Sequence, residues 1–532
     1  MKGQYPKSDT VARLPLEFSE GEEFSKKFSE YVQNGIRRAV PSLFNSIKFI
    51  YKDENKVKIV HSLIENYEKE LRKTNKFTEN SEKIESPDAL FWTLFYLAQH
   101  YDKIGESNKA IITIDKAIEH TPTVIEAYCI KGRIYKHSGD IKMASICYER
   151  AREMDLADRY LNNKSAKYLL RNNQIEKAIS ILGLFTKEGD DVEKYLTDMQ
   201  CMWFELEAGN AHYRLGNYGK SLKKLVAIDT HFKDIVEDQF DFHTYCLRKM
   251  TMRSYIKLLR LEDEVYDHSY YRNATMEIIK TYIHLHLNPS LLVSDKDKEL
   301  ENMDPDQRKK LLKLQKKKEL KEEEDKKQNK GSSNVDKKKT NVNTDTDPEG
   351  ITLINVNDKL ITATKYVQLL EKYSLKDVNA QTLAAQLYLH RKKYLLVIRA
   401  LKRGYIANPN DGLLHKTTVQ FFKQIELENN TIKPTVLNIV LDYRNSILGN
   451  KSIDEFNKSY IEKSKSLSLS DRLYAAETLF YLDNNKKQEA IQFITSTIPS
   501  TKGYTQLQVT KNISYFFIFL FSINYINLII YK

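Results

Sequence analysis

The side chains that could do chemistry are few, and they lack the spacing that catalysis or metal binding requires. His284 and His286 lie two residues apart, so on a helix they would point to different sides and could not share a metal ion. The sequence contains no H-E-x-x-H zinc motif, no Gly-rich phosphate loop and no dinucleotide-binding G-x-G-x-x-G after a strand. Trp92 and Trp203 fall on apolar faces of expected helices, which favours a core role over a ligand-binding cage. We therefore predict that the chain performs no catalysis itself.

Positive charge is concentrated in two stretches. The chain has 84 Lys and Arg against 72 Asp and Glu, and such an excess indicates an anionic partner only where it is concentrated. The first stretch, residues 308–318, would span about 16 Å as a helix. So dense a run of cations would release counterions on binding RNA, and the binding would weaken with salt. For both stretches an ordinary solvated helix surface is the alternative. The first contains Arg308, Lys309, Lys310, Lys313, Lys316, Lys317 and Lys318, and the second contains Lys131, Arg133, Lys136, His137 and Lys142.

Small and aromatic residues recur at an interval of 34. This is the period of the tetratricopeptide repeat, in which two short helices cross closely where small residues sit. We therefore predict an all-α fold, a tetratricopeptide-type solenoid (superhelix) of helical hairpins with a basic and disordered insertion. The repeated positions are Ala98, Gly132 and Ala166; Gly105, Gly139 and Asn173; Ala110, Ala144 and Ala178; and Tyr101 with Tyr135.

The chain, at 532 residues, is too long for one compact core and suits a solenoid. Residues 1–14 are expected to form a linker, residues 15–90 irregular helical repeats, and residues 91–293 the regular solenoid. Residues 294–350 combine the basic helix with a Ser-, Asn-, Thr- and Lys-rich part that cannot bury enough apolar surface to fold. Helical repeats are expected to return over residues 351–508.

The last residues, 509–532, differ in composition from the rest. Residues 512–531 carry no charge and are about long enough to cross a bilayer, which takes about 20 apolar residues. Ile, Phe, Asn, Tyr and Lys are also the amino acids of AT-rich codons, so we expect an artefact of the gene model. A membrane anchor and a buried terminal helix are the alternatives. An anchor would make the chain a membrane-tail-anchored tetratricopeptide adaptor for protein or chaperone partners.

Six short segments resemble the auxiliary (large) subunit of the NatA amino-terminal acetyltransferase complex. They occur in order within residues 13–508, and the fifth and sixth are specific to that family among tetratricopeptide proteins. Full members carry more repeats before the position of Met1 and further helices after that of Gln508, so the chain resembles a fragment. The segments are RLPL (13–16), AQHYDKIG (98–105), IYKHSG (134–139), DRYLN (158–162), MQCMWF (199–204) and DQFDFHTYC (238–246).

The resemblance implies a non-catalytic scaffold that wraps a separate catalytic subunit of the GNAT fold, which binds acetyl-CoA. Such a scaffold tunes the catalytic site toward small amino termini and docks the complex on the ribosome for co-translational acetylation. A small chaperone-like regulatory subunit is a further implied partner. The implied location is the cytoplasm, on the ribosome, with the nucleus as a second compartment.

The same resemblance assigns roles to the two basic stretches. Residues 308–318 resemble the family's internal basic helix, which is implied to touch ribosomal RNA. The family also holds inositol hexakisphosphate in a basic pocket at the subunit interface, and residues 131–142 lie in a suitable region. No other cofactor is expected in this chain.

Overall fold

The computed structural model describes residues 8–186, 191–292 and 347–496, and within these ranges every regular element is a helix. The chain divides into two compact units: unit 1 takes its described residues from 1–199, 410–432 and 441–532, and unit 2 from 200–409 and 433–440. The prediction of an all-α helical solenoid is confirmed. The basic run 308–318 and the apolar tail 509–532 lie outside the described residues.

Unit 1 begins with two short helices, α1 (Asp9–Arg13) and α2 (Pro15–Phe18), followed by α3 (Gly21–Arg37), α4 (Leu43–Ser46), the 3-10 helix η1 (Lys48–Lys52) and α5 (Glu54–Thr74). Helix α1 lies within the interval 1–14, for which the sequence predicted a linker. Two side-chain contacts hold it in place: Tyr31 donates to the Asp9 carboxylate at 3.0 Å, and Arg13 donates to the carbonyl of Ser46 at 3.3 Å. These contacts come from elements far along the chain, which sequence spacing does not reveal.

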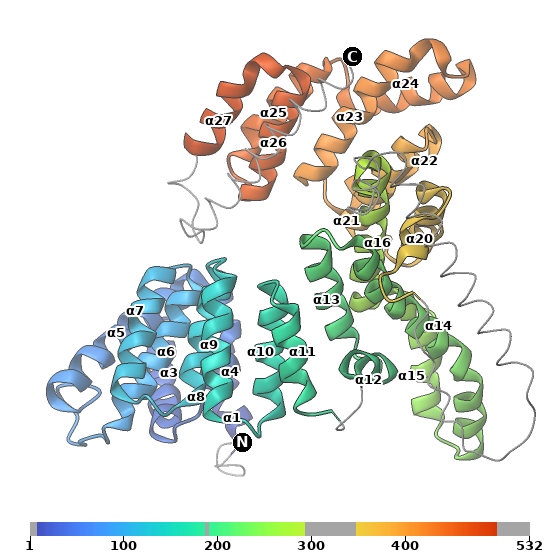
Figure 1. Cartoon of the computed structure of the whole chain (residues 1–532). Helices are drawn as coiled ribbons and strands as arrows, with labels where there is room; N and C mark the ends of the chain where they lie inside the picture. The colour runs from blue at the N-terminus through green and yellow to red at the C-terminus, as the bar shows by residue number, and fades with distance from the viewer. Residues whose placement is uncertain (1–7, 187–190, 293–346, 497–532) are drawn as a thin grey trace, which may run out of the picture. The chain divides into compact units, whose positions relative to one another are not determined.

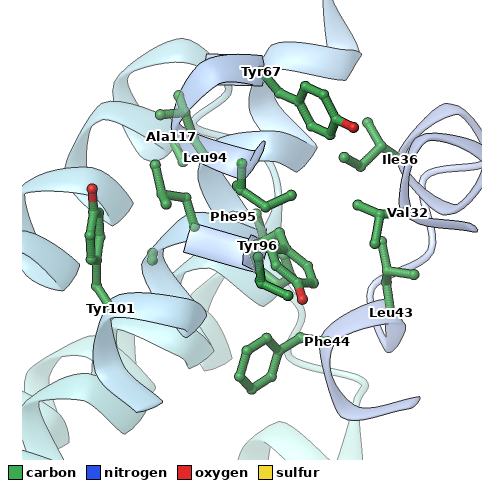
Figure 2. Close-up of a cluster of buried hydrophobic side chains, with 14 of the residues drawn as sticks. Val32, Ile36, Leu43, Phe44, Tyr67, Leu94, Phe95, Tyr96, Tyr101 and Ala117 are labelled. Carbon is green, nitrogen blue, oxygen red and sulfur yellow. The ribbon is translucent and has the colours of Figure 1, made fainter. Parts of the chain in front are cut away.

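A buried core joins these helices to the next pair. Apolar residues of α3 recur every four positions and end buried, as an amphipathic helix requires. They pack with α4, α5 and α6 (Asp88–Lys103), and Figure 2 shows Val32 and Ile36 turned toward the same cluster as Tyr67 and Phe95. This core therefore joins α3, which lies outside the regular repeats, to the first helix of the regular series.

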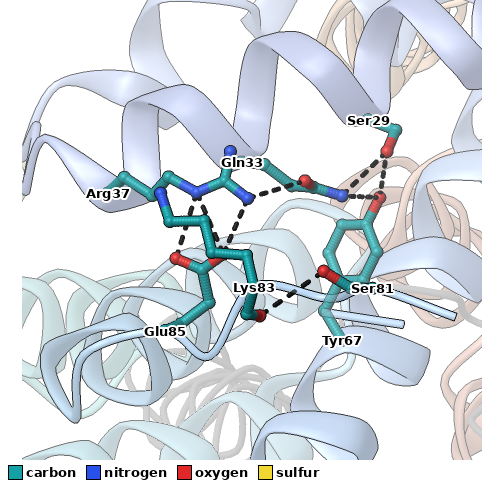
Figure 3. A network of polar contacts seen from close by, with 7 residues as sticks. All are labelled: Ser29, Gln33, Arg37, Tyr67, Ser81, Lys83 and Glu85. Atoms are coloured by element: carbon teal, nitrogen blue, oxygen red, sulfur yellow. Dashed lines mark hydrogen bonds and ion pairs between the residues drawn. The ribbon is translucent and has the colours of Figure 1, made fainter. Parts of the chain in front are cut away.

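A polar network fastens the segment between α5 and α6 to α3. The Arg37 guanidinium donates two hydrogen bonds to Glu85, at 2.7 and 3.0 Å, and the Tyr67 hydroxyl donates to Ser29 at 2.6 Å (Figure 3). Glu85 is 3% exposed in its side chain, so the arginine is its main source of charge compensation. The polar stretch before the first regular repeat is therefore ordered by specific pairing.

Three helix pairs follow the 34-residue period: α6 with α7 (Ser107–His120), α8 (Ile125–His137) with α9 (Ile141–Met154), and α10 (Arg159–Arg171) with α11 (Ile175–Gly183). Figure 1 shows the pairs side by side, from blue to blue-green. A short helix, α12 (Val192–Asp198), ends this part of the chain.

The repeated residues sit where the sequence predicted close approach. The five alanines, Ala98, Ala110, Ala144, Ala166 and Ala178, have no exposed surface. The turn positions Gly105, Gly139 and Asn173 have φ of 86°, 85° and 62°, in the left-handed region that favours Gly and tolerates Asn. A Cβ on Gly132 would lie 2.8 Å from the Tyr148 ring. Tyr101 is buried and Tyr135 partly buried, so all the repeated positions are structural.

The rest of unit 1 comprises α23 (Gly412–Glu428), α24 (Pro434–Leu448) from residue 441 onward, α25 (Ile453–Ser464), α26 (Leu469–Leu482) and α27 (Lys487–Ser496). Helices α25 and α26 both begin with capping boxes, formed by Ser452 with Glu455 and by Ser468 with Asp471. His415 of α23 is buried and stacks on Tyr460 with ring centroids 3.9 Å apart.

Unit 2 contains α13 (Met202–Arg214), α14 (Tyr218–Arg248), α15 (Met252–Glu262), η2 (Val265–Asp267), α16 (Ser269–Leu287), η3 (Pro289–Leu292), α19 (Ile351–Ile354), α20 (Lys359–Tyr373), α21 (Val378–His390) and α22 (Tyr394–Ala407). Helix α20 packs against α16 although residues 293–346 separate them in sequence. The stack of helices in unit 2 thus continues across the interval that holds the basic run.

The chain returns from that interval through a tight backbone crossing. Gly350, with φ of 68°, lies against Gly219 of α14 so closely that a Cβ on either residue would collide with the backbone of the other segment. Lys220 pairs with Glu349 at 2.9 Å, and Lys223 donates to the carbonyl of Asp347 at 2.6 Å. These contacts fix residues 347–354 to unit 2.

No helix within residues 8–186, 191–292 and 347–496 is both long enough and apolar enough to cross a membrane.

Candidate partner and anion-binding surfaces

The five basic residues predicted as an inositol phosphate site lie on α8 and the start of α9, and two of them contact acidic residues of neighbouring helices. Lys131 pairs with Asp115 of α7 at 2.6 Å. Burial disfavours the Lys131 ammonium, yet its hydrogen bond to Asp115 raises the pKa of Lys131 above its usual value. His137 contacts Asp102 of α6 at 2.7 Å.

The other three candidates of this set differ in how exposed their side chains are. Lys136 and Lys142 are exposed, whereas Arg133 is partly buried. The charge of Arg133 contributes to lowering the pKa of Lys164 on α10. Arg133 of the predicted set therefore also belongs to a cluster of cations with residues of α10.

That cluster, which we call the α8–α10 basic cluster, comprises Arg133, Lys164, Lys167 and Arg171. Burial is the largest cause of the lowered pKa of Lys164, and the charges of Lys167, Arg133 and Arg171 lower it further. Lys164, Lys167 and Arg171 are spaced by three and four residues, so they form one stripe on α10. Repulsion among these cations is relieved when an anion binds between them.

Aromatic rings border the α8–α10 basic cluster. The Lys164 ammonium lies 5.4 Å from the centroid of the Tyr160 ring, and the Arg171 guanidinium lies 5.3 Å from that of Tyr168. Tyr160 is 57% exposed, so an apolar and aromatic surface accompanies the charge. Such a combination suits contact with a protein partner as well as with a phosphate-rich ligand.

The sequence carried a signal for this cluster that linear scanning missed. Arg133 and Lys167 are separated by 34 residues, as are His137 and Arg171. Equivalent positions in successive repeats lie on the same face of a solenoid. Comparing basic residues by repeat position, instead of counting them along a short stretch, would have found it.

Two of the remaining candidate residues, His284 and Trp92, contact neighbouring aromatic rings. His284 contacts the Tyr218 hydroxyl through Nε2 at 3.1 Å, and burial lowers its pKa. Trp92 packs edge-on against Phe91 with centroids 5.1 Å apart. Within the described ranges no group of three or more His, Cys, Asp or Glu residues is arranged to hold a metal ion.

Buried His100 is the most perturbed histidine of the repeat region. Its Nδ1 lies 2.7 Å from the Tyr51 hydroxyl and its Nε2 lies 3.1 Å from Nδ1 of His61. Burial first, and then the neighbouring His61, lowers the pKa of His100 to about 4. His100 therefore stays neutral at physiological pH and acts as a structural link between η1, α5 and α6.

The ribosome candidates, Arg308 to Lys318, lie outside the described residues, so their prediction stays a prediction.

Known proteins resemble this chain over most of its length. The family model of the N-terminal acetyltransferase A auxiliary subunit matches residues 1–404. The chain is 38% identical over 500 residues to the N-terminal acetyltransferase A complex auxiliary subunit NAA15 of Arabidopsis thaliana, covering 92% of this chain and 55% of that protein. It is also 38% identical over 524 residues to the mouse N-alpha-acetyltransferase 16, NatA auxiliary subunit, covering 96% of this chain and 60% of that protein.

A solved structure is similar too. The structure of Naa15/Naa10 bound to HypK-THB aligns with a TM-score of 0.66 and 29% identity, covering 83% of this chain and 58% of the matched chain. The chain thus spans between half and two thirds of the length of these relatives. The relatives are named as auxiliary subunits, in agreement with the prediction of a non-catalytic subunit, and no comparison supports a tail-anchored adaptor. This chain belongs to the family of NatA auxiliary subunits.

Proposed function

We propose that this chain is a non-catalytic scaffold that holds a GNAT-fold, acetyl-CoA-binding catalytic subunit for amino-terminal acetylation. The observation that carries the proposal is the match, over 83% of the chain, to an auxiliary subunit solved together with Naa10. The regular helix pairs α6 to α11 supply what a scaffold needs, which is an extended surface on which a partner can lie.

The first helices of the pairs, including α8 and α10, are the proposed contact face. Tyr160 on α10 is 57% exposed and sits beside the α8–α10 basic cluster, whereas Ile146 on the second helix α9 is 48% exposed on another helix of the stack. The two residues make a matched pair for mutation. Tyr160→Glu should weaken binding of the catalytic subunit at least tenfold, because a charge would be buried in the interface.

The functional test measures acetylation of peptides with small or acidic amino termini by the catalytic subunit, with and without this chain. Addition of the chain should raise the rate on Ser- and Ala-initiated peptides relative to acidic ones. The Ile146→Glu variant should keep this effect and Tyr160→Glu should lose it at limiting concentrations. An unchanged ratio of the two rates at saturating wild-type chain would count against the proposal.

We also propose that the α8–α10 basic cluster binds inositol hexakisphosphate. The support is the partial burial of Lys164 among three further cations, since a polyanion would relieve their repulsion. A ligand selective for the native state stabilises it by about 2.7 kcal/mol at one hundred times its Kd. Inositol hexakisphosphate should therefore raise the melting temperature of the complex.

Two double variants locate the site. Lys164→Gln with Lys167→Gln should abolish the thermal shift, and Lys136→Gln with Lys142→Gln, which removes two exposed charges from the originally predicted set, should retain it. The reverse pattern would move the site to the exposed residues. A shift kept by both variants would exclude either location.

We further propose that residues 308–318 dock the complex on the ribosome in the cytoplasm. The support is their density of cations, with seven in eleven residues and no acid. Charge reversal at Lys316, Lys317 and Lys318 should weaken ribosome co-sedimentation and leave acetylation of free peptides intact. Unaltered sedimentation would remove the assignment.

A further inference from the structure

A third concentration of positive charge lies on three helices of unit 2. Residues 359–409, which form α20, α21 and α22, carry ten Lys or Arg and two Asp or Glu, whereas the whole chain has an excess of twelve. Residues 410–496, which form α23 to α27, carry eleven of each sign. The charge is thus a local feature of α20 to α22 and does not reflect the composition of the helices in general.

The two acidic residues of this segment are already engaged. The Glu371 carboxylate, 7% exposed in its side chain, accepts from Tyr388 at 2.6 Å and from Arg399 at 2.8 Å. Asp377 pairs with Arg272 of α16 at 3.2 Å. Both carboxylates are thus bound to arginines, and residues 359–409 keep an excess of eight positive charges.

The cations extend along one side of α20. Arg391 donates to Thr364 at 2.7 Å, and Arg399 and Arg403 both reach Glu371, at 2.8 and 3.5 Å. Thr364 and Glu371 are seven residues apart, so they share a face of α20 and lie about 10 Å apart along its axis.

Six exposed lysines lie in the same segment, and we call these lysines together with Arg391, Arg399 and Arg403 the α20–α22 basic face. Two of the lysines follow Arg391 directly, and one lies between Arg399 and Arg403 in the sequence of α22. The six are Lys365, Lys372, Lys376, Lys392, Lys393 and Lys402.

We propose that the α20–α22 basic face binds the phosphate backbone of structured RNA. The lysines are exposed and are distributed over α20, α22 and the segments that adjoin them, which suits an extended polyanion better than a single phosphate. Lysines act as point charges on flexible stems and contact phosphates without demanding one fixed geometry. Backbone contact of this kind positions RNA without reading its sequence.

The inference rests on the proposed function only in naming ribosomal RNA as the source of the ligand. The face is separate in sequence from residues 308–318, so the two regions would contact RNA independently. An acidic protein is the alternative partner, and competition by polyglutamate against unlabelled RNA distinguishes the two.

The test measures binding of the full chain, in complex with its catalytic subunit, to a fluorescent ribosomal RNA hairpin at several salt concentrations. The face variant carries Lys365→Gln, Lys393→Gln and Lys402→Gln. The control variant carries Lys451→Gln, Lys458→Gln and Lys463→Gln, which removes three exposed lysines from the charge-balanced helices. Both variants keep residues 308–318 intact.

The face variant should bind RNA at least tenfold more weakly, and the slope of log Kd against log salt should be shallower by about two to three. The control variant should match the wild type, and peptide acetylation should be unchanged in both. Equal RNA binding by the two variants would overturn the proposal. Competition by polyglutamate as strong as that by unlabelled RNA at equal charge would also overturn it, in favour of an acidic protein. Loss of acetylation in wild-type complex would instead indicate failure of the proposed scaffold function.

Discussion

The crossing of Gly219 and Gly350 offers a quantitative test of how the chain re-enters unit 2 after residue 346. Gly350→Ala should be destabilising for two separate reasons. Its φ of 68° is a left-handed conformation, which costs a non-Gly residue about 1–2 kcal/mol. Its new Cβ would also lie 2.5 Å from the carbonyl carbon of Gly219. Because the atoms that it meets belong to the backbone, no change of side-chain rotamer can relieve the collision.

Two other glycines separate these effects. Gly449 has φ of 60°, and no neighbouring atom lies within 4 Å of the position that a Cβ would take, so Gly449→Ala measures the conformational cost alone. Gly219 is helical, where Ala is favoured over Gly, so any loss of stability in Gly219→Ala comes from the collision with the carbonyl oxygen of Glu349. We expect about 1 kcal/mol for Gly449→Ala, about 2 kcal/mol for Gly219→Ala and about 3 kcal/mol for Gly350→Ala.

Hydrogen exchange is the suitable assay, because local opening of residues 347–358 reports the free energy of this contact directly. A loss of about 3 kcal/mol corresponds to at least a hundredfold faster exchange. Exchange should accelerate in this segment for Gly219→Ala and Gly350→Ala, and near residue 449 alone for Gly449→Ala. Similar exchange of residues 347–358 in Gly350→Ala and wild type would refute the crossing.

Two further predictions concern buried polar groups. Burial lowers the pKa of His100 and of His415 to about 4, below the value of about 6.5 expected in the unfolded chain. Between these two values the unfolded chain binds more protons than the folded chain. The contribution of each histidine to stability is therefore fully present above pH 6.5 and is lost as the pH falls toward 4, by at most about 3 kcal/mol. Melting measured as a function of pH should show a weaker loss in His415→Phe than in the wild type, and parallel curves would contradict this. Arg37→Met should lower the free energy of unfolding by about 2 kcal/mol in chemical denaturation, because it leaves the buried Glu85 carboxylate uncompensated. The control Lys27→Met breaks an exposed pair within one helix and should lower it by less than about 0.5 kcal/mol. Equal effects of the two variants would show that the Glu85 pair does not stabilise the fold.

The regular part of the fold could be predicted because its physics is local and periodic. Ala98, Gly132 and Ala166 repeat every 34 residues since each repeat must solve the same problem of close helix crossing. The left-handed turn residues gave the same period independently, with Asn173 in the place of a glycine. Such signals survive in one sequence because each position is constrained by its own repeat.

Features that depend on distant contacts were not visible. Helix α1 forms inside an expected linker because Tyr31 and Ser46 hold it, and neither residue marks a helix start. The α8–α10 basic cluster joins Arg133 to residues of α10, whereas the sequence prediction grouped Arg133 with basic residues of its own repeat, on α8 and the start of α9. In a solenoid, residues at equivalent positions of successive repeats lie close together in space although they are far apart in the sequence.

Whether this chain forms a scaffold for an acetyltransferase can be read from the mass of the complex. The chain and the GNAT-fold catalytic subunit from the same genome would be co-expressed, purified through a tag on the catalytic subunit, and analysed by size-exclusion chromatography with light scattering. We expect a stable particle whose mass corresponds to one copy of each chain. Recovery of the catalytic subunit alone, under conditions in which this chain is soluble and helical, would contradict it.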